Sequence, residues 1–338
     1  MTMAGRDGIP DWVSRIRDPA VRSLAAAWTA RARRTPNNMA RVAAALAWPK
    51  QVVFHVTSAV MRIIDDFVDD DFLARPAEER AHTRDAALAR LEHWCLDATS
   101  AAAGRHAVPP GNDEAVYFEA LRAVCAPRGA IGPAPFRALT GALEADIRER
   151  PLARWGDFHA YAEGAAGAPA SIFVTLLATD IGDDFSGHYG LATPATDIAR
   201  ALALFCYLVH ILRDLTEDAR GNPQLLTIPA EVLDPLGLDR PGLAAAVQAG
   251  DVRRLLPLVD AIAGEARRWR SRAIADVAAL VRLIGPVERA VIETLFKLYD
   301  EQFAAIVAAP EAVIAGTAGL APERVQAVLA AGLPSPTA

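Results

Sequence analysis

Apolar residues recur every three or four positions along almost the whole chain, with charged and polar residues between them. This spacing is typical of helices that bury one face and expose the other. Runs in which β-branched and polar residues alternate, the pattern of strands, are hard to find. We therefore predict an all-α fold. The predicted helices cover residues 19–33, 51–70, 77–99, 113–125, 133–149, 155–181, 194–218, 241–248, 251–283 and 286–307.

Pro- and Gly-rich stretches separate the predicted helices. The clearest are AAAGRHAVPPGND at 101–113 and ARGNPQLLTIPAEVLDPLG at 219–237, and the second is long enough to act as a flap. No shift in composition divides the chain into two cores, and no repeat of solenoid length is visible. We therefore expect one domain over residues 1–338, in which 309–338 form a peripheral tail with a short helix at 321–331.

Composition narrows the classes of function. The chain has 338 residues, of which 52% are hydrophobic, and its net charge of −6 gives no basic surface of the kind that binds nucleic acid. The only lysines, Lys50 and Lys297, do not lie in a GxxxxGK[ST] phosphate-binding loop. Three scattered cysteines without a CxxC pair fit a reducing compartment better than a disulfide framework.

A membrane-spanning helix is not expected. Arg6, Asp7 and Asp11 stand where a signal peptide would need an apolar core. The longest apolar candidate, GAAGAPASIFVTLLAT at 164–179, contains glycines and a proline and is shorter than the roughly 20 residues that a span needs. We therefore expect a cytoplasmic protein, and peripheral membrane contact stays open in case the substrate is long and apolar.

The first of two acidic clusters is IIDDFVDDD at 63–71. On a helix, Asp65 and Asp69 lie one turn apart on the same side. Aspartates at a helix C-terminus oppose the macrodipole, so a compensating cation is expected, and Arg62 supplies part of that charge. The alternative for this cluster alone is an exposed acidic helix end that binds nothing.

The second cluster, HILRDLTEDAR at 210–220, follows a strongly apolar stretch, so its polar residues enter the interior or a cavity. His210, Asp214 and Asp218 form one stripe along this helix. Carboxylates gathered in a cavity repel each other unless a divalent cation neutralises them. Mg²⁺ prefers oxygen ligands and is usually held by a few carboxylates together with substrate phosphates. We therefore predict a Mg²⁺-dependent diphosphate site between the two helices.

Simpler interpretations of single residues stay open. His210 alone fits a hydrogen-bonded core histidine as well as a site residue. Arg213 and Glu217 are i, i+4 partners that would pair on the helix surface. The small residues in YAEGAAGAPASIFV at 161–174 fit either close helix packing or space beside Tyr161 for a long apolar ligand.

Several motifs recur in a recognisable order between about residues 40 and 307. They are Arg62-x-x-Asp65-Asp66-x-x-Asp69, Asp146 in GALEADI, Tyr161 in YAEGAAG, Ile211-Leu-Arg-Asp214-x-x-Glu217-Asp218, and Tyr299 in LYDEQFAAI. Either aspartate motif alone is a weak signal, but the ordered set resembles the squalene/phytoene synthase family.

The resemblance implies an all-helical isoprenoid synthase fold with a central cavity. Members of the family join two allylic prenyl diphosphates head to head, through a cyclopropyl diphosphate, to squalene, dehydrosqualene or phytoene. Two or three Mg²⁺ ions would then be the cofactors, and the use of NADPH stays open. By position, the implied metal ligands are Asp65, Asp69, Asp214 and Asp218. The implied catalytic residues are Arg62, Tyr161, Arg213 and Tyr299. The implied substrate-binding residues are Arg62, Asp66, Tyr161, Tyr207, His210 and Arg213.

The chain also departs from the family pattern. Tyr207 and His210 stand where the second motif usually has Gln and Asn, and imidazole is a poorer partner for Mg²⁺ than an amide oxygen. His210 is therefore expected to bond a diphosphate oxygen or a metal-bound water instead. The other differences are the missing Arg and Tyr in Asn222–Pro229, Asn38-Met-Ala-Arg41 in place of a Ser-rich stretch, Ser58 at a usual tyrosine, and Pro169 within the usual Val-Gly.

Two other functions stay open, and the altered Tyr207, His210 and flap positions motivate the first of them. A class I terpene cyclase would ionise a single prenyl diphosphate on the same scaffold. A non-catalytic member would bind lipid or serve as an assembly partner, although it would not need all four aspartates. Substrate chain length, the product and the oligomeric state are not determined by the sequence.

Overall fold

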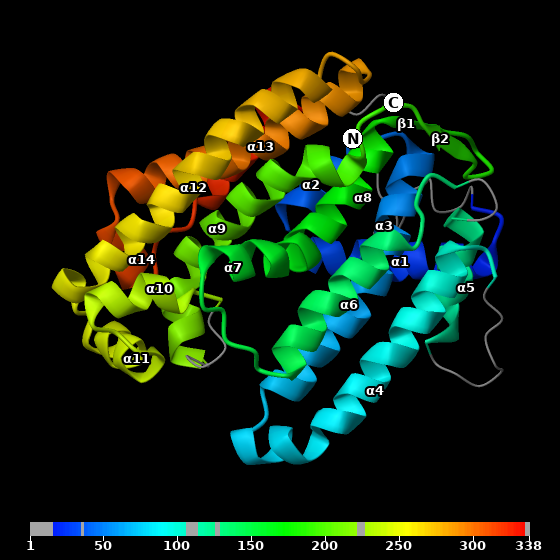
Figure 1. Cartoon of the computed structure of the whole chain (residues 1–338). Coiled ribbons are helices and arrows are strands. Elements are labelled where there is room, and N and C mark those ends of the chain that lie inside the picture. Colours follow the sequence, from blue (N-terminus) through cyan, green and yellow to red (C-terminus); the bar gives the residue numbers. More distant parts are fainter. Residues whose placement is uncertain (1–15, 35–36, 106–113, 126–128, 222–226, 335–338) are drawn as a thin grey trace.

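Helices make up nearly all of the computed structural model, which describes residues 16–34, 37–105, 114–125, 129–221 and 227–334 (Figure 1). The first α-helices are α1 Pro19–Arg34, α2 Asn38–Ala43, α3 Trp48–Asp66, α4 Ala77–Ala102, α5 Ala115–Cys125, α6 Ala134–Ile147, α7 Trp155–Ala162 and α8 Ala168–Leu177. The remaining ones are α9 Ala195–Gly221, α10 Ala230–Leu233, α11 Arg240–Ala249, α12 Val252–Leu280, α13 Pro286–Ala308, α14 Glu311–Ala315 and α15 Pro322–Gly332. The all-α prediction is confirmed.

Most helix ends lie within three residues of their predicted positions, because local signals set them. Pro286 and Pro322 begin α13 and α15, where a missing backbone N–H costs nothing. Asp239 and Asp251 cap α11 and α12 by accepting hydrogen bonds from the backbone of the first turn. The short helices α2, α10 and α14 were not predicted, since they are too brief to show a clear period.

Two predicted helices are interrupted by π-helical segments. The segment η2, Phe67–Leu73, follows α3 without a break, and η3, Glu163–Gly167, joins α7 to α8. The predictions of single helices over 51–70 and 155–181 were therefore wrong in these stretches. π-Helical turns are rare and often occur at functional sites. Here both lie beside residues that the motifs single out, Asp69 and Tyr161.

A small hairpin replaces the end of the predicted helix 155–181. Strand β1, Thr179–Ile181, pairs antiparallel with β2, Gly187–Tyr189. The loop between them is rich in turn-forming residues, and Asp184 accepts hydrogen bonds from the backbone N–H and hydroxyl of Ser186. This local turn chemistry ends the helix at Leu177, so the expectation of a helix to residue 181 was wrong.

Helix α9 is the centre of the structure. It contacts α8 and η3 on one side and α12 and α13 on another. In Figure 1, α12 and α13 lie along one side of α9, and α4, α5 and α6 lie across the molecule from them. The buried side chains of the described residues form a single hydrophobic core that reaches from Ile16 to Val328.

The segment after Pro310 packs more closely than a peripheral tail would. Its first helix, α14, contacts α9, and the hydroxyl of Thr216 on α9 donates to the carbonyl of Val313 at 2.7 Å. Helix α15 contacts α13, and Gln302 of α13 accepts a hydrogen bond from the backbone of Leu320 at 2.8 Å. Val313 is fully buried. This part of the chain therefore supports the core.

Helix α9 is long and apolar enough to cross a membrane by length and composition. Core helices of globular proteins pass the same test, and 56% of its most apolar window is buried inside the fold. It also carries the charged residues of the second acidic cluster. Its apolar character is accounted for by its place at the centre of the core.

The predicted flap is only partly described. Residues 222–226, which include Asn222, lie outside the described residues. The part that follows forms α10 and the 3₁₀ turn η5, Asp234–Leu236. The backbone N–H groups of Ala230 and Glu231 donate to the carbonyls of Leu152 and Ala153, just before α7. The described end of this segment is thereby attached to the start of the helix that carries Tyr161.

Candidate active site

The first aspartate motif spans the junction of α3 and η2. Arg62 pairs with both neighbouring carboxylates, with Nη1 2.6 Å from Oδ2 of Asp65 and Nε 2.5 Å from Oδ1 of Asp66. Asp69 lies one turn on, in η2, with part of its side chain exposed. Desolvation of its carboxyl, and then repulsion from Asp65, raise the pKa of Asp69 to about 7. The motif therefore has more negative charge than Arg62 balances.

A third element brings another carboxylate to this motif. Asp146 lies at the end of α6, and the hydroxyl of Tyr161 donates to its Oδ2 at 3.0 Å. Burial raises the pKa of Asp146 to about 7, against the opposing effect of the Tyr161 hydrogen bond, and the charges of Asp69 and Asp65 raise it further. The motifs included Asp146 but assigned it no role. A sequence signal exists, since Asp146 continues the helical spacing of the buried Leu139 and Leu143.

Two arginines fix how α6 and η2 lie relative to each other. Arg80 on α4 donates to Oε1 of Glu149, just after α6, at 2.6 Å and to the carbonyl of Arg75, just after η2, also at 2.6 Å. Arg84 binds the carbonyl of Ile147 at 3.1 Å and pairs with Glu149. Glu149 adopts a left-handed conformation with φ of 51°, which these bonds stabilise. The bonds hold together the two elements that carry Asp69 and Asp146.

Tyr207 connects α9 to the first motif. Its ring stacks on that of Phe158 with centroids 5.8 Å apart, and it lies 6.3 Å from the ring of Tyr161. Burial raises the pKa of Tyr207 above its usual range, and the charges of Asp146 and Asp69 act in the same direction. The second helix of the predicted site therefore approaches the first motif through an aromatic cluster.

His210 is partly buried. Its Nε2 lies 2.8 Å from the hydroxyl of Tyr299 on α13, and the side chain of Asn38 on α2 also hydrogen-bonds that hydroxyl. Burial lowers the pKa of His210 to about 4, and the positive charge of Arg213 lowers it further. Burial raises the pKa of Tyr299 and keeps it protonated, so the phenol donates to Nε2 when the neutral imidazole carries its proton on Nδ1. Sequence reasoning missed Asn38 as a site residue, although it marked that stretch as unusual.

The second aspartate motif has its own arginine. Arg213 binds Asp214 through two bonds, from Nε to Oδ1 at 2.7 Å and from Nη2 to Oδ2 at 2.5 Å. The expected Arg213–Glu217 pair is therefore replaced by a pair with the adjacent residue. Desolvation, and then repulsion from Asp214 and Glu217, raise the pKa of Asp218 to about 6. Each motif thus contains an ion pair between an arginine and an aspartate, and a further carboxylate whose pKa is raised.

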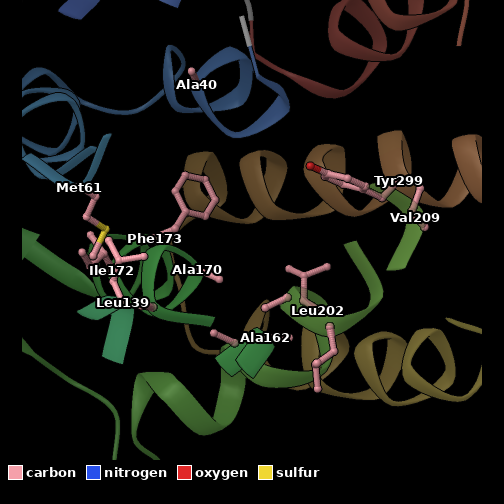
Figure 2. Close-up of a cluster of buried hydrophobic side chains, with 14 of the residues drawn as sticks. Ala40, Met61, Leu139, Ala162, Ala170, Ile172, Phe173, Leu202, Val209 and Tyr299 are labelled. Carbon is pink, nitrogen blue, oxygen red and sulfur yellow. The ribbon is translucent and has the colours of Figure 1, made fainter. Parts of the chain in front are cut away.

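An apolar region lies among the helices that carry these residues. Figure 2 shows Met61 of α3 and Leu139 of α6 together with Phe173 of α8, Leu202 of α9 and Tyr299 of α13. Small residues, Ala162 and Ala170 among them, lie between the larger side chains (Figure 2). The small residues near Tyr161 therefore lie in an apolar environment shared by five helices. A central cavity stays a prediction.

The carboxylates fit Mg²⁺ only as parts of a larger coordination shell. Across the described ranges, no three His, Cys, Asp or Glu side chains converge closely enough to hold an ion by themselves. The raised pKa values of Asp69 and Asp218 show negative charge that a cation would relieve. Paired carboxylates that share an ion with substrate phosphates suit the chemistry of Mg²⁺. The metal ligands and the roles of the other site residues stay predictions.

A surface hollow of about 670 Å³ lies beside the hairpin. Its lining includes Gly129, Asp180 and His188 and none of the residues of the candidate site. The hollow is therefore separate from the two aspartate motifs and their aromatic neighbours.

The model of one protein family, described as squalene/phytoene synthase, matches residues 32–327. The chain belongs to the squalene/phytoene synthase family. It is accordingly a prenyltransferase-like enzyme, and at the level of the family its reaction is head-to-head prenyl transfer. The match extends past residue 307, where the motifs end, into the segment that packs against α9 and α13.

Solved structures share the fold of this squalene/phytoene synthase family member. A dehydrosqualene synthase in complex with a ligand superposes with a TM-score of 0.68 at 17% identity, over 92% of this chain and 95% of the other. Squalene synthase HpnC from Alicyclobacillus acidocaldarius gives a TM-score of 0.62 at 16% identity, over 92% of this chain and 100% of the other. No curated protein matches the sequence. These likenesses identify the isoprenoid synthase fold.

Proposed function

We propose that the protein condenses two allylic prenyl diphosphates of 15 or 20 carbons head to head, in a Mg²⁺-dependent reaction that releases diphosphate. The observation that carries the proposal is the arrangement of the two aspartate motifs. Each has an ion pair between an arginine and an aspartate and carries more negative charge than that arginine balances, and the helices that carry the motifs also contribute to the apolar region. Diphosphate groups would bind at the motifs, and the prenyl chains would lie among the apolar side chains.

Ionisation of an allylic diphosphate needs positive charge at the leaving group. Mg²⁺, when bound, supplies it as a Lewis acid. Arg62 and Arg213 are placed to add to it, because their side chains are 43% and 38% exposed and reach the motif carboxylates. When a diphosphate and its cations occupy the motifs, the arginine pairs with Asp65 and Asp214 would open, and the guanidinium groups would clamp the phosphates.

The resulting carbocation must be protected from water. Phe173 and Leu202 are at least 95% buried and provide an apolar wall. Tyr299 lies within the hydrophobic core, and the rings of Tyr161 and Tyr207 pack against it. Aromatic faces can stabilise positive charge. Asp146 orients Tyr161 through the 3.0 Å hydrogen bond.

The direct test is to incubate pure protein with Mg²⁺ and each of geranyl, farnesyl and geranylgeranyl diphosphate, with and without NADPH. Diphosphate release and product mass are measured, and a product with twice the carbon number of the substrate is expected. Asp65→Asn and Asp214→Asn are expected to lose activity by at least about 100-fold, in line with removal of a key electrostatic group. Asp85→Asn, at an exposed position on α4, is the matched control and keeps full activity.

Two results would contradict the condensation. A cyclic hydrocarbon or alcohol with the carbon number of one substrate would identify a class I terpene cyclase. That second candidate is favoured by Tyr207 and His210, which replace the amides that the family usually has in the second motif. Full activity after chelation of Mg²⁺ would overturn the proposal. The absence of diphosphate release with every substrate would also overturn it and would favour a non-catalytic lipid-binding role.

A further inference from the structure

The partly buried His210 and the buried Tyr299 form a hydrogen-bonded pair beside the apolar region. The 2.8 Å bond joins α9 to α13, and we call the pair the Tyr299–His210 relay. Tyr299 is 7% exposed, and Figure 2 shows its side chain within the cluster formed by Phe173 and Leu202. The hydrogen-bond partner of His210 in the structure is therefore Tyr299, whereas the sequence predicted a diphosphate oxygen or a metal-bound water.

The phenol oxygen keeps a free lone pair. With the neutral imidazole protonated at Nδ1, the phenol donates its proton to Nε2 of His210 and accepts a hydrogen bond from the amide of Asn38, so one of its two lone pairs is left for a further partner. Such a lone pair can accept a proton from a prenyl chain bound beside Tyr299. The imidazole behind it can take up the phenol proton at the same moment, so the oxygen need never carry a full positive charge.

We propose that the Tyr299–His210 relay ends the reaction by removing a proton from the last carbocation, an inference that rests on the proposed function. The C–H bond beside the cationic carbon breaks, and its electron pair forms a C=C bond. The proton binds to the Tyr299 oxygen while the phenol proton passes to Nε2 of His210. The relay is restored when the imidazolium returns its proton to the tyrosine and the tyrosine proton passes to the released diphosphate.

A weak base is sufficient for this step. A C–H bond next to a carbocation is strongly acidic, and loss of the proton relieves a positive charge in an apolar site. The neutral form of a buried imidazole is the form that can accept a proton. In this last half of the reaction, the cyclopropyl diphosphate is converted to an alkene and a diphosphate that carries one more proton, so no reductant takes part. The relay therefore predicts that two allylic prenyl diphosphates give an alkene that has not been reduced.

The first test uses the unaltered protein. With Mg²⁺ and farnesyl or geranylgeranyl diphosphate, the hydrocarbon is expected to have two hydrogen atoms fewer than the reduced product, whether or not NADPH is present. With deuterated NADPH, no deuterium should enter the product. Deuterium incorporation would show that hydride ends the reaction and would overturn the relay. Absence of diphosphate release would overturn the proposed function and the relay with it.

The second test changes the relay itself. His210→Gln keeps an oxygen at about the reach of Nε2 to accept the Tyr299 hydrogen bond, but an amide does not accept the proton. The ratio of hydrocarbon to water-captured alcohol or retained cyclopropyl diphosphate is expected to fall about 100-fold, the lower range for a positioned general base. Tyr299→Phe should shift the ratio in the same direction. His93→Gln, on the exposed face of α4, is the control and leaves the ratio unchanged.

Diphosphate release and circular dichroism are measured on the same samples. If either relay variant is folded and releases diphosphate but makes the hydrocarbon in the original ratio, the relay is wrong while the proposed function stands. A product shift in both variants with a normal unfolding transition supports the relay, because loss of packing alone would lower turnover without redirecting the product.

Discussion

Replacement of Asp146 by Asn is expected to stabilise the metal-free protein at neutral and alkaline pH. In the fold, burial and the nearby Asp65 and Asp69 raise the pKa of Asp146 from 3.8 to about 7. Asparagine has nearly the same shape and keeps an oxygen that accepts the hydrogen bond from Tyr161. The substitution therefore removes the unfavourable charge and leaves the contact in place.

The sign and size of the effect follow from proton linkage. Because the pKa of Asp146 is higher in the folded than in the unfolded state, the folded state binds the proton more tightly, and stability falls as pH rises from about 4 to 7. A rise of about 3 pKa units corresponds to about 4 kcal/mol once the group is ionised in both states. Solvent screening at the partly exposed carboxyl reduces this value, so we expect a gain of about 2–4 kcal/mol at pH 8.

The assay is urea unfolding followed by circular dichroism at pH 5, 6, 7 and 8, in the presence of a metal chelator. The gain of Asp146→Asn should shrink as pH falls and vanish below about pH 4, where the carboxyl is protonated in both states. Asp85→Asn on α4 is the matched control and should show no such trend. A gain that is the same at pH 5 and pH 8, or a loss at pH 8, would refute the electrostatic reasoning.

Three further changes test separate parts of the structure. Lys50→Ala removes the partner of Glu288 from an ion pair of 2.7 Å whose side chains are 7% and 14% exposed. Urea unfolding should then show that the free energy of unfolding falls by about 3–5 kcal/mol, because a buried carboxylate is left unpaired. A double variant that also carries Glu288→Ala should recover part of this loss, and a double variant no more stable than Lys50→Ala would contradict the reasoning. Tyr161→Phe removes the hydrogen bond that lowers the pKa of Asp146. NMR titration of the carboxyl groups should therefore show a higher pKa for Asp146 in this variant. Thr216→Val removes a buried hydroxyl bonded to α14, so stability should fall by about 1 kcal/mol; hydrogen exchange should quicken in α14 but not in α4.

Regular elements could be predicted because their signals are local. Apolar periodicity and prolines placed α13 within one residue of its observed ends, 286–308 against 286–307. The π-helical segments η2 and η3 could not be found this way, because one extra residue per turn leaves the apolar pattern almost unchanged. The hairpin at 179–189 was hidden by the apolar run that precedes it.

The site was predicted in part. The ordered motifs placed Asp65 and Asp214 on α3 and α9, and the structure shows both helices beside one apolar region. The partners of individual side chains depended on tertiary packing. Asp146 needed α6 to lie against η2, and the bond between His210 and Tyr299 needed α13 to cross α9. Neither contact follows from spacing along one helix.

The bond between Thr216 and α14 has a consequence for how the protein can be made and handled. Thr216 lies between the two aspartates of the second motif, and its acceptor Val313 is 97 positions further along the chain. The supports of this motif are therefore complete only after Val313 has been synthesised, and closing such a distant contact is slow in folding. A chain truncated before residue 311 would keep every residue of the motifs. It would lose α14 and with it the hydrogen bond that supports the second aspartate motif.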